Sequence, residues 1–90
     1  MALPYKVELS PRAGRDLDAL PREEAKRIAQ ALTALKSDPR PRGVLKVKDA
    51  AAPTWRLRVG EYRALYSVSD KAQLVVVLRV RRRSEDTYSR

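Results

Sequence analysis

The sequence contains no cysteine and no histidine among its 90 residues. Without cysteine, the chain can form neither a disulfide bond nor a thiolate metal site, which suits a reducing compartment. Without histidine, it cannot build a Ser/His/Asp or Cys/His arrangement, a histidine-held zinc ion or a neutral imidazole base. Any catalysis must therefore use Arg, Lys, Tyr, Asp, Glu or backbone groups.

The chain also lacks any apolar run that approaches the roughly 20 residues needed to span a bilayer. Its first residues, "MALPYKVELS", alternate apolar and polar side chains, whereas a signal peptide has a continuous apolar core. We therefore expect a cytoplasmic protein without a membrane partner. The length predicts a single domain over residues 1–90, with a core of modest size.

Acidic residues are scarce in the second half of the chain. Residues 1–39 hold 7 Lys and Arg against 6 Asp and Glu, whereas residues 40–90 hold 13 against 5, so +8 of the net charge of +9 lies in the second half. Basic charge concentrated in this way indicates a polyanionic partner or an acidic protein that covers the same surface. A generally basic, solvated surface is the alternative.

The first half of the chain predicts one strand and two helices. "YKVEL" at residues 5–9 alternates as a half-buried strand does. Ser10 is a suitable N-cap and Pro11 suits the first helical position, while Pro21 begins a second helix. That helix has an apolar stripe typical of a core-facing surface, formed by Ala25, Ile28, Ala29, Leu32 and Leu35.

The second half predicts strands joined by short turns. "VLKVK" is a short strand or an extended loop, and "WRLRV", "YRALYSV" and "QLVVVLRV" are strands, the last apolar on both faces as in the middle of a sheet. A tight turn falls at Gly60-Glu61. Short turns indicate antiparallel neighbours. The predicted fold class is α+β: a small antiparallel sheet with two N-terminal helices packed on one face.

Alternation in "WRLRV" places Arg56 and Arg58 together on the sheet face that the helices leave open. Arg63 follows the turn on the next strand, and other basic residues can converge on the same face: Lys46, Lys48, Arg81, Arg82 and Arg83. Guanidinium groups grip phosphate oxygens in pairs, and Trp55 or Tyr88 could stack on a base. The pattern indicates a phosphodiester site. A solvated strand face is the alternative interpretation.

The pieces "YKVELSPRAGRDLDALP", "RIAQALTALKSDPRPRG", "WRLRVGEYRALYSV" and "LVVVLRVRRR", followed by Tyr88, occur in the order found in a known superfamily. Together they resemble the RelE/ParE toxins of type II toxin–antitoxin pairs, over nearly the whole chain. The resemblance implies a compact α+β fold and an antitoxin partner. For the RelE branch it implies metal-independent cleavage of mRNA in the ribosomal A site, without a cofactor, by attack of the RNA 2′-hydroxyl to leave a 2′,3′-cyclic phosphate.

The resemblance also assigns site residues. Arg56 and Arg58 occupy the two alternate basic positions before the turn, and Arg63 matches the arginine after it. Tyr88 matches the late tyrosine. The basic residue that ends the last strand is Arg83 when counted from the strand and Arg82 when counted back from the tyrosine. Further RNA-binding candidates are Lys46, Lys48, Arg81 and Arg82.

Two other functions stay open from the sequence. The ParE branch implies inhibition of DNA gyrase without RNA cleavage. A pure interaction module, whose basic face only binds an acidic antitoxin, is the third possibility. Arginine at both alternate positions speaks against strong RNA cleavage, because lysine would be the easier general base.

Overall fold

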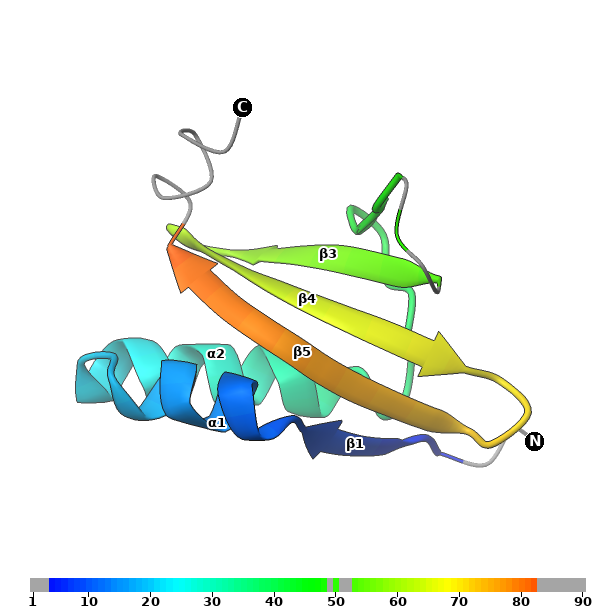
Figure 1. The fold of residues 1–90 in the computed structure, drawn as a ribbon, viewed down its shortest axis with the longest axis horizontal. Coiled ribbons are helices and arrows are strands. Elements are labelled where there is room, and N and C mark those ends of the chain that lie inside the picture. The colour runs from blue at the N-terminus through cyan, green and yellow to red at the C-terminus, as the bar shows by residue number, and fades with distance from the viewer. Residues whose placement is uncertain (1–3, 49, 51–52, 83–90) are drawn as a thin grey trace.

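The computed structural model describes residues 4–48, 50 and 53–82. Within this described part, two helices follow the first strand and four further strands follow the helices (Figure 1). The elements are β1 (Lys6–Leu9), α1 (Pro11–Asp18), α2 (Arg22–Ala34), β2 (Leu45–Lys46), β3 (Thr54–Val59), β4 (Tyr62–Ser69) and β5 (Leu74–Arg82).

The five strands form one sheet in the order β1-β5-β4-β3-β2. The three pairs from β2 to β5 are antiparallel, whereas β1 pairs with β5 in parallel. The predicted fold class is confirmed, with this one parallel pair as a difference. Its reason is that β1 and β5 are not joined by a hairpin, since two helices and three strands separate them along the chain.

Helix α1 begins as the sequence predicts. The Ser10 hydroxyl oxygen accepts a hydrogen bond from the Ala13 N–H at 3.0 Å, and Pro11 is the first helical residue. Ser10 also holds the start of the helix against β5, because its N–H donates to the Val77 carbonyl at 2.8 Å and its hydroxyl to the Leu78 carbonyl at 3.0 Å. Helix α1 therefore continues along β5 from the point where β1 ends.

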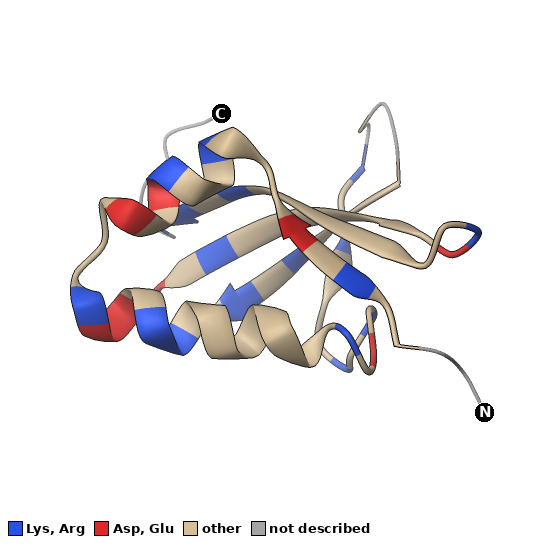
Figure 2. Ribbon diagram, turned by 90° about the horizontal axis from the view of Figure 1, so that it is seen from below, with Lys and Arg blue, Asp and Glu red and all other residues tan. Residues whose placement is uncertain are grey.

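Helix α2 supplies much of the core. Ile28, Leu32 and Leu35 are buried, whereas Ala29 from the predicted stripe is exposed. Pro21 is the N-cap of α2 and lies before its first residue. Both helices lie on the same side of the sheet (Figure 1, Figure 2).

Strands β4 and β5 carry the other half of the core. On β4 the buried side chains alternate, as a strand with one covered face requires: Tyr62, Ala64 and Tyr66. On β5 they are Val75, Val77 and Val80. The irregular spacing of the last three comes from a register shift between Leu65 and Tyr66 that leaves Leu78 without a partner on β4.

Tyr66 is fully buried and its hydroxyl donates to the Pro39 carbonyl at 2.7 Å. This bond ties the connection after α2 to the middle of the sheet. Burial raises the pKa of Tyr66 to about 12.

No described helix combines the length and apolar character that a bilayer crossing needs.

Candidate nucleic-acid interface

The basic site begins with the alternation along β3. Trp55, Leu57 and Val59 are partly buried and pack against the core, so they face the helices. Arg56 and Arg58 consequently project from the opposite, open face. This part of the sequence interpretation is confirmed.

A two-residue turn sets the register of the next strand. Val59 pairs with Tyr62, and Gly60 has φ of 59°, the left-handed value that a tight hairpin turn needs at its first position. The same register places Arg58 directly opposite Arg63. The turn therefore brings two arginines side by side on the open face.

The row of arginines continues into β5. Arg63 has Arg58 as its cross-strand partner on one side and Arg81 on the other. Adjacent strands are about 4.8 Å apart, so the three backbone positions span roughly 10 Å. Strands β3, β4 and β5 contain no acidic residue (Figure 2). All the formal side-chain charges that these three strands contribute are therefore positive.

A shallow hollow of about 210 Å³ lies among these residues. Its lining consists of Gly43, Leu45, Arg56, Arg58 and Arg63. The structure thus brings together three of the predicted catalytic residues. Three guanidinium groups around one hollow offer many N–H donors to the oxygens of a phosphodiester. They also place fixed positive charge where an anionic transition state would develop.

Gly43 and Leu45 were not singled out from the sequence. They reach the hollow because β2 pairs with β3 so that Leu45 is opposite Arg56. The only sequence signal is the alternation in "VLKVK", which does not reveal which face is buried.

Lys46 does not join the arginines. It pairs with Trp55, and its Nζ lies 5.9 Å from the centroid of the Trp55 ring, on the side of the sheet that faces the helices. The guanidinium carbon of Arg40 lies 5.5 Å from the same centroid. Trp55 is thus a half-buried cation–π partner, not a residue of the open face that could stack on a base. Lys48 is exposed in the turn after β2.

The basic residues at the end of β5 diverge. Arg82 pairs in register with Tyr62, on the helix side, and its NH2 lies 3.9 Å from the Glu61 Oε1. Arg81 is half-buried and lines a second hollow of about 490 Å³ near the end of α1, together with Arg15 and Arg79. Arg83 and Tyr88 lie outside the described residues.

Arg79 is held by α1. Its Nε donates to the Asp16 Oδ2 at 2.9 Å, and the same oxygen accepts the backbone N–H of Val80 at 2.9 Å. Burial by itself would raise the pKa of Asp16. The bonds from Arg79 and Val80, with the charges of Arg79 and Arg12, outweigh burial and hold that pKa below its usual value. Asp16 therefore stays ionised and holds Arg79 beside α1, outside the hollow that Arg56, Arg58 and Arg63 line.

Asp70 lies just beyond the far end of β4 and is bound by two other residues. Its carboxylate accepts the Tyr5 hydroxyl at 2.6 Å and the Arg40 NH2 at 2.8 Å. Both bonds lower the pKa of Asp70, and the bond from Tyr5 has the larger effect. Seven residues of strand, about 23 Å, separate Asp70 from Arg63, so the two cannot pair.

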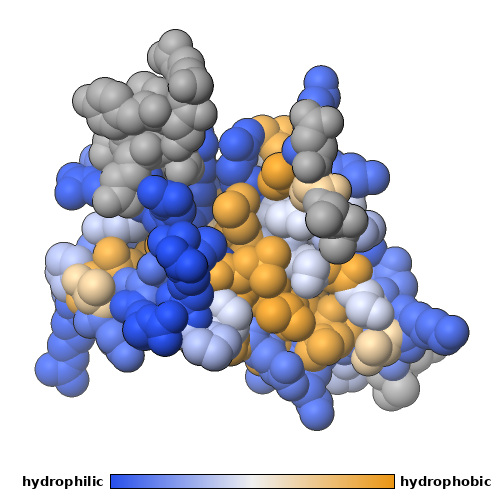
Figure 3. Space-filling view, in the orientation of Figure 1, coloured by the Kyte–Doolittle hydropathy of each residue, from blue (hydrophilic) through white to orange (hydrophobic). Residues whose placement is uncertain are grey.

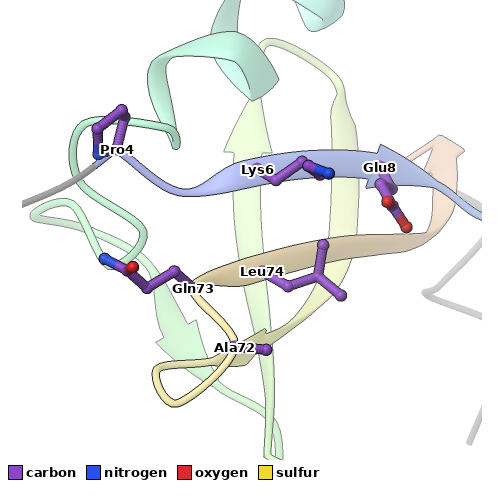
Figure 4. A pocket seen from close by; sticks show the side chains of 6 residues that line it. All are labelled: Pro4, Lys6, Glu8, Ala72, Gln73 and Leu74. Atoms are coloured by element: carbon purple, nitrogen blue, oxygen red, sulfur yellow. The ribbon is translucent and has the colours of Figure 1, made fainter.

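Apolar surface adjoins strongly hydrophilic side chains on the face of the molecule that Figure 3 shows. Another hollow, of about 490 Å³, lies where β1 meets the turn before β5 (Figure 4), and its lining is Pro4, Lys6, Glu8, Ala72, Gln73 and Leu74. It carries one basic and one acidic side chain, so it lacks the excess of positive charge at the arginine row.

Among the described residues, no group of three or more acidic side chains could hold a metal ion.

Comparison with known proteins shows which family the chain belongs to. The sequence profile described as "ParE toxin of type II toxin-antitoxin system, parDE" matches residues 7–87. The chain belongs to the RelE/ParE toxin superfamily. A curated relative, the putative toxin RelE1 of Methanocaldococcus jannaschii, is 26% identical over 81 residues, which cover 88% of this chain and 90% of the relative.

Solved structures support the same assignment. The toxin–antitoxin complex RelBE2 of Mycobacterium tuberculosis contains a chain that is 33% identical, with a TM-score of 0.80, covering 93% of this chain and 97% of the other. The archaeal RelE–RelB complex of Pyrococcus horikoshii contains a chain that is 27% identical, with a TM-score of 0.79, covering 90% and 97%. These RelE/ParE homologues were crystallised with their antitoxins. The present protein is thus a type II toxin by family.

Proposed function

We propose that this RelE/ParE toxin is a ribosome-dependent mRNA endoribonuclease that works without a metal ion and inhibits translation. The observation that carries the proposal is the hollow lined by Arg56, Arg58 and Arg63 on the open face of the sheet. A site built from guanidinium groups suits a phosphodiester that gains charge during reaction. Ribosomes and mRNA are the partners that this function requires.

The proposed chemistry is internal transfer at the RNA backbone. The 2′-hydroxyl loses its proton and attacks the adjacent phosphorus, the bond to the 5′-oxygen breaks, and the products are a 2′,3′-cyclic phosphate and a 5′-hydroxyl. Arg63 holds the scissile phosphate, and Arg56 and Arg58 stabilise its added charge. In this proposal the three guanidinium groups bind and stabilise charge, and none of them is assigned the role of general base.

Two further roles come from the RelE resemblance. Tyr88 orients the base beside the cut and helps to move a proton, and Arg83 or Arg82 stabilises the leaving oxygen. Of these two arginines, the described Arg82 is on the helix side in register. That position favours Arg83 as the catalytic residue within this proposal.

Inhibition of DNA gyrase is the second candidate function, because the matching family profile is that of ParE. The two are separated by testing the purified toxin on translating ribosomes, with RNA end-mapping, and in parallel on gyrase supercoiling. Cleavage within A-site codons is the expected result. Intact mRNA together with inhibited supercoiling would refute the nuclease proposal and favour the gyrase one.

The remaining partner is the antitoxin. We expect a cognate antitoxin that carries acidic residues and covers the basic face or packs beside the helices, since residues 40–90 carry +8 of the net charge.

A further inference from the structure

Leu45 is the most exposed large apolar side chain among the described residues, at 57%. Isolated exposed leucines are common on protein surfaces and need no explanation. Leu45 differs because it lines the hollow that Arg56, Arg58 and Arg63 form. An apolar side chain therefore shares one small space with three guanidinium groups.

The pairing of β2 turns its polar side chain toward the helices and its apolar side chain toward solvent, which is the reverse of the usual arrangement. Lys46 is directed to the helix side, near the Trp55 ring, and Leu45 to the open side, opposite Arg56. The Val47 N–H donates to the Thr54 carbonyl at 2.8 Å and helps to fix this register. A slip of one residue would exchange the faces. The observed register thus presents a leucine to solvent without any gain for the core.

The size of the hollow limits what Leu45 can contact. About 210 Å³ accommodates a flat ring, whereas an α-helix with its side chains is about 10 Å across and could only lie over the hollow. Gly43 contributes a wall without a side chain. Trp55 points to the other side, so Leu45 is the large apolar group among the described residues that line this hollow.

We propose that Leu45 packs against the face of the nucleobase next to the phosphate that the arginines hold. The inference rests on the proposed RNA function and adds a base-contacting residue to it. A nucleotide matches the lining because its base has an apolar face and its phosphate takes the guanidinium donors. Leucine offers no directional hydrogen bond, so the contact favours a base without selecting a particular sequence.

The test compares Leu45→Ser with Leu9→Ser, because Leu9 is 45% exposed and lies on β1, at the opposite edge of the sheet. Each full-length variant is titrated by fluorescence anisotropy with a short single-stranded 2′-O-methyl RNA, which cannot undergo 2′-hydroxyl attack. We expect Leu45→Ser to weaken binding about fivefold to tenfold and Leu45→Met to restore it. Leu9→Ser should change binding by less than about twofold.

Removing single bases from the same RNA separates a base contact from an indirect effect. In the wild type, an abasic nucleotide at the contacted position should weaken binding about as much as Leu45→Ser does. In the Leu45→Ser and Leu45→Gln variants, that abasic change should have no further effect. Additive losses, or failure of the wild type to bind the RNA, would overturn the inference.

A loss of antitoxin binding by Leu45→Ser, with unchanged RNA binding, would also overturn it and assign the residue to a protein interface. Cleavage on translating ribosomes is scored separately. A wild type that binds RNA through a Leu45-dependent base contact but cleaves no mRNA would refute the proposed nuclease and leave the base contact standing.

Discussion

Arg58 and Arg63 are direct cross-strand partners in the β3–β4 hairpin, so two like charges occupy neighbouring positions of the sheet. Like charges directly opposite each other destabilise a strand pair. Arg81 extends the row to β5. Such a row costs a small domain stability, and local conflicts of this kind are expected at functional surfaces.

Replacing Arg58 by Gln should raise the free energy of unfolding by about 0.2–1 kcal/mol, because the repulsion with Arg63 is removed. Urea denaturation at low salt measures the gain, which should shrink as salt screens the charges. Lys26→Gln on the exposed surface of α2 is the control for net charge. An equal gain from that control would show that the row itself carries no strain.

Replacing Arg63 by Ala should lower mRNA cleavage on programmed ribosomes about 10²–10³-fold, since it removes a donor to the developing charge. Tyr88→Phe should also reduce cleavage, because the proposed proton movement needs the phenol; this residue stays a prediction from the sequence alone. Thermal melts and antitoxin binding establish that both variants are folded. Full cleavage by both the Arg63→Ala and the Tyr88→Phe variants would refute the proposed site.

Replacing Asp16 by Ala should lower the free energy of unfolding by about 2 kcal/mol, because Arg79 and the Val80 N–H lose their acceptor. Denaturant titration measures the loss. Asp18→Ala on the exposed side of the same helix is the matched control. Similar losses from both changes would mean that the bonds to β5 add nothing to stability.

The Asp16 contribution should also depend on pH. The pKa of Asp16 is lower in the folded state than in the unfolded chain. The stability it adds is therefore fully present above the unfolded value, near 3.9, and is lost as pH falls through the folded value. The difference between wild type and Asp16→Asn should be constant from pH 5 to 7 and shrink below about pH 4. A difference that grew on acidification would contradict the assignment.

Association with the antitoxin should weaken as salt rises. Single exposed ion pairs contribute only about 0–1 kcal/mol, but many of them speed association and add affinity across a large interface. Calorimetry over a salt series measures the effect. An affinity that did not change with salt would contradict a contact between acidic residues of the antitoxin and the basic residues at 40–90 of the toxin.

Local patterns predicted the elements well where a single rule decides them. Ser10 and Pro11 mark the start of α1, and the Gly60 turn fixes the hairpin. The alternation in "WRLRV" placed Arg56 and Arg58 correctly, because Trp55 and Leu57 must be covered.

Other features depend on contacts between distant segments. The parallel pairing of β1 follows from the path of the chain over the helices, and no short motif encodes it. Lys46 was expected beside the arginines but faces Trp55, because the register of a two-residue strand is set by its partner. The pair of Asp16 and Arg79 joins positions 63 residues apart, which a sequence pattern does not connect.

The Asp16 carboxylate also has a consequence for self-association. It occupies the Val80 N–H on the side of β5 where α1 has replaced β1. An incoming strand would need that donor to extend the sheet, so this part of β5 cannot act as a template for another chain. The outer strands β1 and β2 are only four and two residues long. Within the described part of the sheet, another copy of the toxin could therefore add a strand only along two brief edges, which disfavours fibrous aggregation of a lone molecule.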